Sequence, residues 1–266
     1  MLTKRLIACF DIIEGRVTKA VRFQDNIDVA PAEELAETMY NAQVDELIFY
    51  DITASAQKRS IDIETVKKVA RRVFIPFTVG GGIKDLNDMY EALKAGAEKI
   101  SIDSMAVRNP QIISEGAKAF GSQCIVLSTQ VKRAKNMPSG YEVYIDGARL
   151  ATGMDALEWI KRGQELGAGE ICLNSIDNDG TLSGYDLELM KLADSAVSVP
   201  LIASGGAGAP EHLKALFTDT EAQAAIISSM LYSPRMEKNY TISELKDYLT
   251  KNDIVVRPLR INDRLP

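Results

Sequence analysis

Two related stretches decide the fold: Pro76–Gly82, which reads PFTVGGG, and Pro200–Gly206, which reads PLIASGG. Each is followed by an amphipathic segment and then by a second apolar run that ends in Ser-Met, at Ala97–Met105 and at Ala224–Met230. A strand, a glycine turn, a helix and another strand form the repeating unit of a parallel α/β sheet. Because the chain contains this unit twice, the sequence predicts one closed barrel assembled from two similar halves.

The length agrees with a single (β/α)8 barrel, the TIM barrel. With 266 residues the chain is close to the usual size of that fold, so we expect one α/β domain over 1–266. The half-barrels are predicted at about 1–122 and 123–253. The tail 254–266 shows no periodicity and is assigned to neither half.

Strand and helix signals alternate along the chain. We expect strands at Leu6–Ile13, Glu46–Ile52, Phe74–Val79, Lys99–Ile102, Cys124–Val131, Glu170–Ser175, Pro200–Ser204 and Ala224–Ser228. We expect helices at Ala32–Asn41, Ile63–Arg72, Asp85–Ala95, Pro110–Phe120, Asp155–Leu166, Leu187–Ser195, Pro210–Leu216 and Thr241–Thr250. Two longer connections, Glu14–Asp28 and Lys132–Tyr144, are expected to cover the active face.

The composition excludes several classes of function. A net charge of −6 argues against nucleic acid as a partner. No apolar run spans a bilayer and no signal-peptide pattern precedes the first strand, so we expect a cytoplasmic protein without membrane attachment. The three cysteines show no CxxC spacing and are expected to be buried thiols. His212 is the only histidine, and we expect neither a metal nor a cofactor.

The two glycine pairs are candidate phosphate sites. Each follows a strand and precedes a helix, where free N–H groups and the helix dipole attract anions. Neighbouring strand ends add hydroxyl and carboxyl side chains. One predicted site therefore contains Gly82, Asp103 and Ser104, and the other contains Gly205, Gly206, Ser228 and Ser229. Two such sites at one barrel mouth imply a long substrate with a phosphate at each end, whereas the alternative is that the glycines only form tight turns.

Asp11 is the leading candidate for acid/base chemistry. It lies at the end of an otherwise apolar strand, Cys9–Ile13, where a carboxylate must be paired, raised in pKa or functional. The alternative is a salt bridge to Arg16 or Lys19 in the following connection.

Taken together, these residues resemble the cyclase subunit of imidazole glycerol phosphate synthase, an enzyme of the histidine pathway, from the N-terminus to about Arg257. The matching stretches are Ile7–Asp11 with Gly15–Lys19, Asp45–Ser55, Thr78–Ile83, Phe120–Gln123, Gly167–Glu170, Asp179–Thr181 with Gly184–Asp186, and Ile202–Gly208. The resemblance implies a barrel that takes ammonia from a separate glutaminase subunit of the HisH type. With that ammonia it would convert a phosphoribulosyl-formimino-aminoimidazole-carboxamide ribotide, which carries two phosphates, to imidazole glycerol phosphate and aminoimidazole-carboxamide ribotide.

The resemblance also implies roles for particular residues. Asp11 would be a general acid/base, Lys19 would lie on a mobile loop over the substrate, and Asp179 and Gly180 would contribute to substrate binding. The ammonia entrance would be formed at the bottom of the barrel by Arg5, Glu46, Lys99 and Glu170. The alternative for these four charged residues is a salt-bridge ring that only stabilises the barrel.

One position departs from the resemblance. The family's second catalytic aspartate ends the fifth strand, where this chain has Gln130, and Asp103 stands where the family usually has Asn. An amide forms hydrogen bonds but does not transfer a proton. Two hypotheses follow: a cyclase that tolerates Gln130, or an ammonia-conducting subunit that serves a sugar amidotransferase in cell-surface polysaccharide synthesis. If the missing carboxyl limits a cyclase, Gln130→Asp should raise its turnover.

Overall fold

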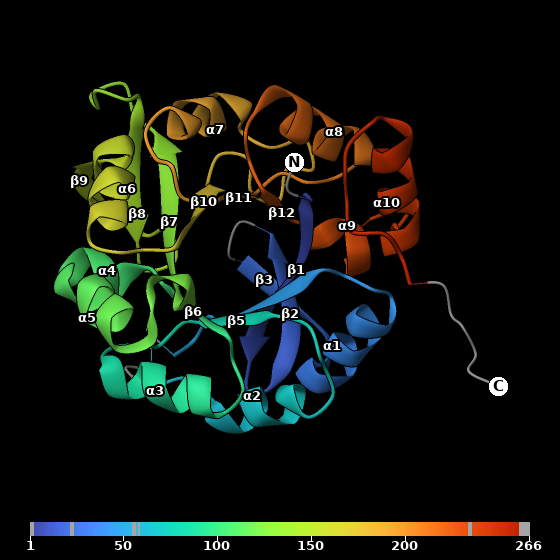
Figure 1. The fold of residues 1–266 in the computed structure, drawn as a ribbon, viewed down its shortest axis with the longest axis horizontal. Coiled ribbons are helices and arrows are strands. Elements are labelled where there is room, and N and C mark those ends of the chain that lie inside the picture. Colours follow the sequence, from blue (N-terminus) through green and yellow to red (C-terminus); the bar gives the residue numbers. More distant parts are fainter. Residues whose placement is uncertain (1–2, 22–23, 55–56, 58, 234–235, 261–266) are drawn as a thin grey trace.

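The computed structural model describes residues 3–21, 24–54, 57, 59–233 and 236–260. In this part of the chain, eight parallel strands form a closed barrel, which confirms the predicted TIM-barrel fold (Figure 1). In their order around the barrel they are β1 (Arg5–Ile13), β4 (Glu46–Asp51), β5 (Phe77–Gly80), β6 (Lys99–Ile102), β7 (Ile125–Arg133), β10 (Glu170–Ser175), β11 (Leu201–Ser204) and β12 (Ala224–Ile226). Pairing of β12 with β1 closes the ring.

Helices surround the strands in chain order, as the colours of Figure 1 show. They are α1 (Ala32–Asn41), α2 (Ile63–Ala70), α3 (Leu86–Lys94), α4 (Ser104–Arg108), α5 (Gln111–Phe120), α6 (Ala156–Glu165), α7 (Leu187–Asp194), α8 (Pro210–Asp219), α9 (Ser229–Tyr232) and α10 (Ile242–Lys251). Each predicted helix is present within a few residues of its expected ends. The short helices α4 and α9 were not predicted, because four or five residues are too few to show a helical period.

The two long connections are strand hairpins. After β1, the chain forms β2 (Arg16–Val21) and β3 (Gln24–Pro31), and after β7 it forms β8 (Tyr141–Ile145) and β9 (Leu150–Asp155). Both hairpins pair antiparallel with the barrel strand that precedes them. The same order of elements thus occurs from β1 to α5 and from β7 to α10, apart from a short 3-10 turn at Ser122–Cys124.

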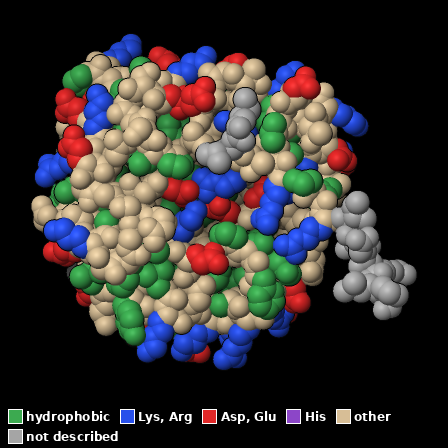
Figure 2. All heavy atoms as spheres, viewed as in Figure 1, with side chains coloured by type: hydrophobic (Ala, Val, Ile, Leu, Met, Phe, Trp, Pro, Cys, Tyr) green, Lys and Arg blue, Asp and Glu red, His purple; other side chains and the backbone are tan. Residues whose placement is uncertain are grey.

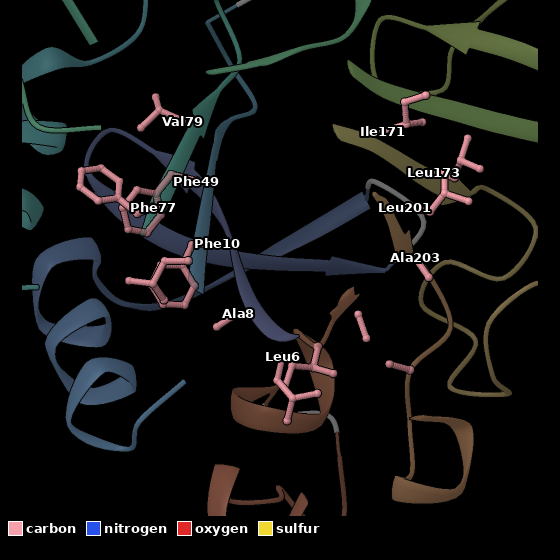
Figure 3. Close-up of a cluster of buried hydrophobic side chains, with 14 of the residues drawn as sticks. Leu6, Ala8, Phe10, Phe49, Phe77, Val79, Ile171, Leu173, Leu201 and Ala203 are labelled. Atoms are coloured by element: carbon pink, nitrogen blue, oxygen red, sulfur yellow. The ribbon is translucent and has the colours of Figure 1, made fainter. Parts of the chain in front are cut away.

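Alternation along each strand separates the outer core from the barrel interior. Leu6, Ala8 and Phe10 of β1 pack outward with side chains of neighbouring strands and the helices. Figure 3 shows Phe10 near Phe49 and Phe77, and the rings of Phe10 and Phe49 are 5.3 Å apart. The intervening residues of β1 point inward, where a second apolar cluster fills the interior. It contains Ile7, Cys9, Ile48, Val126, Cys172, Ile202, Ala224 and Ile226.

Close backbone approach explains why two of the glycines are required. A Cβ on Gly81 would lie 2.2 Å from the carbonyl oxygen of Asp51, and its φ is +84°. A Cβ on Gly206 would lie 2.0 Å from the carbonyl oxygen of Gly184, with φ at +99°. L-residues rarely adopt such φ values, so turn geometry alone already demands glycine at both positions.

Other features concern the cysteines and the last helix. Cys9 and Cys172 are buried thiols outside any disulfide, as predicted, but Cys124 is only partly buried because it lies in the 3-10 turn before β7. The ammonium of Lys246 in α10 is 2.7 Å from the carboxylate of Asp45, and both side chains are almost fully buried. Asp45 also accepts the N–H of Leu6, so this pair fixes α10 to the start of β1. The helices of the described segments are all too short or too polar to cross a bilayer.

Candidate active site

Strand alternation places polar residues at both ends of the barrel interior. Since successive side chains of a strand point to opposite faces, every second residue of β1 faces inward: Arg5, Ile7, Cys9 and Asp11. The same rule gives Lys99, Ser101 and Asp103 on β6 and beyond its end. The inward positions thus begin in charged residues, continue through apolar and hydroxyl side chains, and end in carboxyl and amide groups.

The four charged residues predicted at the bottom form a closed ring. Arg5 Nη1 lies 2.7 Å from Glu46 and 2.9 Å from Glu170, and Lys99 Nζ lies 3.2 Å and 2.9 Å from the same two carboxylates. Each cation therefore contacts both anions. Figure 2 shows basic and acidic side chains gathered at the centre of one face, inside the circle of helices. Glu46 and Glu170 are mostly buried, so the ring is far less screened by solvent than a surface ion pair.

Hydroxyl groups lie between the ring and the opposite end of the barrel. The Tyr50 hydroxyl is 3.3 Å from the hydroxyl of Ser101, and Ser128 is the neighbouring inward residue on β7. Burial raises the pKa of Tyr50 well above its usual value and raises the pKa of Cys172 to about 12. These groups are therefore neutral at physiological pH. The level of the barrel interior between the charged ring and the opposite end is therefore polar but uncharged.

Asp11 lies at the mouth, the end of the barrel at which the strands finish. It is partly buried on β1, opposite Thr18 of β2 and Tyr50 of β4 in strand register. The alternative partner Arg16 instead forms a salt bridge of 2.8 Å with Asp28. Lys19 belongs to β2, but its side chain is outside the described residues, so its predicted position over the substrate stays a prediction.

Gln130 contacts a carboxyl group directly. Its Nε2 donates a hydrogen bond of 2.6 Å to Oδ2 of Asp103, across the junction of β7 and β6. The Oε1 atom of Gln130 is buried and has no hydrogen-bond partner among the described residues. Burial raises the pKa of Asp103 to about 7, an effect that the hydrogen bond from Gln130 only partly offsets. Gln130 lies on β7, four strands around the ring from β1, which is directly across the mouth from Asp11.

The first predicted phosphate site lies at the ends of β5 and β6. The predicted helix Asp85–Ala95 is present as α3, which begins at Leu86, and Asp85 caps it by accepting the N–H of Asp88. Among the N–H groups at the start of α3, that of Asp88 is therefore already engaged within the chain. The hydroxyl of Ser104 accepts the backbone N–H of Asp146, in the turn between β8 and β9. The carboxyl of Asp103 accepts a hydrogen bond from Gln130.

The second predicted phosphate site lies at the ends of β11 and β12, across the barrel from the first. The loop after β10 folds over its glycines: Gly184 donates its N–H to the carbonyl oxygen of Gly206. A Cβ on Gly205 would lie 3.5 Å from the backbone nitrogen of Asp179, so Asp179 and the adjoining Gly180 lie next to this glycine pair. The hydroxyl of Ser228 is 2.9 Å from that of Tyr232, and Ser229 begins helix α9.

Sequence reasoning missed two groups near the mouth. Asn174 is two residues beyond Cys172 on β10 and lies opposite Gln130 in register, so counting every second residue from Glu170 would have found it. Asp146 pairs with Arg108 at 2.6 Å and brings the β8–β9 turn over α4. No sequence signal predicted that contact, because it depends on how the hairpin folds. Among the described residues, His, Cys, Asp and Glu form no cluster of three that would hold a metal.

Comparisons with known proteins agree on one family. The family model described as "Histidine biosynthesis protein" matches residues 5–237. A protein of Desulfosudis oleivorans is 52% identical over 260 residues, covering 97% of this chain and 99% of that protein. A protein of Prochlorococcus marinus is 46% identical over 259 residues, covering 97% and 100%. Both carry the name imidazole glycerol phosphate synthase subunit HisF.

Proposed function

The chain belongs to the histidine biosynthesis protein family as a HisF subunit of imidazole glycerol phosphate synthase, and on that premise we propose which of its residues carry out the reaction. It is a lyase, the cyclase subunit of the synthase, and acts in histidine biosynthesis. Its substrate, in our proposal, is the bis-phosphorylated formimino ribotide, which reacts with ammonia to give imidazole glycerol phosphate and aminoimidazole-carboxamide ribotide.

Asp11 is assigned as a general acid/base at the mouth. The support is its position: an inward carboxyl at the carboxyl end of a barrel strand, where TIM-barrel enzymes hold their reactive groups. Forming an imidazole from ammonia and a carbonyl carbon releases water, so a proton must reach the departing oxygen and protons must leave the incoming nitrogen. A carboxyl group that changes protonation state during turnover performs such transfers. Lys19 is assigned to the substrate from the resemblance alone.

The two phosphates of the substrate are assigned to opposite sides of the mouth. One group is Gly82, Asp103 and Ser104, and the other is Asp179, Gly180, Gly205, Gly206, Ser228 and Ser229. The strand order supports this assignment, because β5 and β6 lie half a turn around the barrel from β11 and β12. A substrate held at both ends would lie across the mouth, with its reacting centre between Asp11 and the opposite side of the mouth.

The charged ring is assigned as the entrance for ammonia, and the partner as a glutaminase of the HisH type that docks on that face. The relatives' name, a subunit of a synthase, supports a complex. The interior above the ring is apolar with neutral hydroxyls, a lining through which neutral ammonia passes without the desolvation that a charged species would suffer. We also propose that the protein works in the cytoplasm without nucleic acid, membrane or cofactor.

The observation that carries the proposal is the barrel with a closed ion-pair ring at one end and carboxyl groups at the other. It is tested by measuring consumption of the ribotide with free ammonium ions, then with glutamine plus the glutaminase. Wild-type protein should turn over in both assays, and Asp11→Asn should lose activity in both by on the order of 10²–10⁴-fold. An inactive wild-type protein under free ammonium would overturn the assignment of the substrate.

Separate variants test the phosphate sites and the ring. Ser229→Asp places a negative charge at the second phosphate site and should raise KM, whereas Ser195→Asp at the exposed end of α7 is the matched control. Lys99→Met opens the ring and should lower glutamine-dependent turnover more than ammonium-dependent turnover. Equal losses in both assays would show that the ring only stabilises the barrel.

The conduit hypothesis rested on the absence of a carboxyl at Gln130. Asp103, 2.6 Å from Gln130, provides a carboxyl at the same part of the mouth, so this argument loses its force. A sugar amidotransferase partner therefore has no specific support from the geometry.

A further inference from the structure

Two carboxyl groups belong to the inward positions at the mouth of the described barrel, and the proposed function uses only Asp11 as an acid/base. The other is Asp103, which follows β6 and is partly buried. Although it immediately precedes helix α4, its side chain does not cap that helix. The carboxyl is instead turned toward the neighbouring strand, where Gln130 Nε2 contacts it at 2.6 Å.

The surroundings of Asp103 keep its carboxyl close to neutrality. Burial, together with a smaller effect of the negative charge of Asp146, raises its pKa to about 7 against the opposing effects of the Gln130 hydrogen bond and the charge of Arg108. Arg108 is itself engaged by Asp146 at 2.6 Å, so it is not a dedicated partner of Asp103. Cys172 on β10 is a further titratable neighbour, and its thiol is neutral. No cation in the described chain forms a salt bridge with Asp103.

Gln130 can support either protonation state of that carboxyl. In the orientation observed, its amide N–H donates to Asp103 and favours the ionised form. Its buried Oε1 atom has no partner. After rotation of the amide by half a turn, that oxygen would accept a hydrogen bond from the O–H of the neutral carboxyl, because O and N occupy equivalent positions in the side chain. An amide is therefore a suitable partner for a carboxyl that alternates between two states.

We propose that Asp103 is the second general acid/base of this enzyme rather than a phosphate ligand, which leaves Gly82 and Ser104 at the first phosphate site, and that Gln130 is its positioning residue. This inference rests on the proposed cyclase function and deepens it. In each turnover, protonated Asp103 gives its proton to the oxygen or nitrogen that departs from the substrate, and the ionised carboxylate takes a proton back from the nitrogen that becomes part of the ring. Asp103 thus ends the cycle as it began. The acid/base that an amide at position 130 does not supply comes from the adjacent strand.

The decisive test exchanges the two groups. Asp103→Asn keeps the size and a hydrogen-bond acceptor but removes the proton, so ammonium-dependent kcat should fall by on the order of 10²–10⁴-fold. Gln130→Asp alone places two carboxyls side by side and should lower turnover rather than raise it, because one proton would be shared between them. The double variant Asp103→Asn/Gln130→Asp restores one carboxyl and one amide in exchanged positions. It should recover at least about tenfold over Asp103→Asn alone, as expected for a returned acid/base.

Two further readouts separate a chemical role from a structural one. Asp194→Asn is the control, since Asp194 is another carboxyl of raised pKa but lies at the end of α7, away from the mouth. It should leave kcat unchanged. NMR of protein labelled with 13C at aspartate carboxyls should show one group titrating near neutrality in the wild type, and this signal should be absent in Asp103→Asn.

The outcomes distinguish the inference from the proposed function. Wild-type protein that consumes the ribotide with ammonium, together with Asp103→Asn of unchanged kcat, would overturn the role of Asp103 and leave the cyclase function intact. The role of Asp103 would also be overturned if kcat of the double variant were no higher than that of Asp103→Asn and kcat of Gln130→Asp were higher than that of the wild type. An inactive wild type would overturn the proposed function itself, whatever the NMR titration of Asp103 shows.

Discussion

Asp103→Asn should make the protein more stable while it lowers activity, and the gain in stability should depend on pH. The fold raises the pKa of this carboxyl from 3.8 to about 7, so the folded state holds a proton that the unfolded chain releases above about pH 4. The wild-type protein therefore loses stability as the pH rises between these two values. Asparagine does not titrate, so the variant lacks this loss.

The size of the effect follows from the two pKa values. Each pKa unit corresponds to about 1.36 kcal/mol, so full ionisation of Asp103 in the fold costs about 4 kcal/mol as an upper limit. Between about pH 5 and about pH 8 the difference in unfolding free energy between variant and wild type should grow by about 2.5 kcal/mol. For a protein of this size, that growth corresponds to roughly 5–10 °C in Tm.

Circular dichroism melting of both proteins at the two pH values measures this difference. Comparison of variant and wild type at each pH cancels the titration of all other groups that the substitution leaves unchanged. A Tm difference that stays constant with pH, or that favours the wild type at the higher pH, would refute the reasoning, because Asp103 would then ionise in the fold as it does in water.

Three further changes test features away from the acid/base pair. Gly206→Ala should destabilise the fold by more than about 2 kcal/mol in urea unfolding, because the new Cβ would meet a carbonyl oxygen at 2.0 Å. Gly140→Ala is the control: Gly140 also has a positive φ but has open space around it, so this change should cost about 1 kcal/mol. Lys246→Met leaves a buried carboxylate unpaired and should cost about 3–5 kcal/mol; a loss below about 1 kcal/mol would mean that the ammonium contributes nothing. In the native protein at about pH 8, Cys124 should react with a thiol reagent before Cys172, whose buried thiol has its pKa raised to about 12. Mass spectrometry of the labelled peptides measures the order, and labelling of Cys172 first would contradict this prediction.

The barrel was predictable from sequence because its signals are local and repeated. Lys99–Ile102 and Glu170–Ser175 appear in the structure with the predicted bounds, since each is a short apolar run between clear turns. The hairpin strands were harder: Arg16–Val21 mixes charged and apolar residues, and its pairing with β1 depends on a long-range register. Local pattern alone carries no information about such a register.

For the candidate site, individual residues were predictable from the sequence, but the contacts between them were not. The charged ring joins four strands, and its members were identifiable only because the resemblance to the cyclase family implied them. The contact between Asp103 and Gln130 was not predicted, although both positions had been singled out. A sequence pattern relates each residue to its own strand, and only the placement of β6 beside β7 brings an amide to the carboxyl.

The hydrogen bond between Asp103 and Gln130 crosses the one place where the predicted halves of the barrel adjoin in sequence, from β6 to β7. If the chain were cut near Gly121 and the two pieces were produced separately, one polypeptide would carry both mouth carboxyls and the other would carry the amide. Neither fragment alone would hold the complete pair. Catalysis would then require complementation between fragments, and the ionisation of a single side chain would report whether the two pieces had docked.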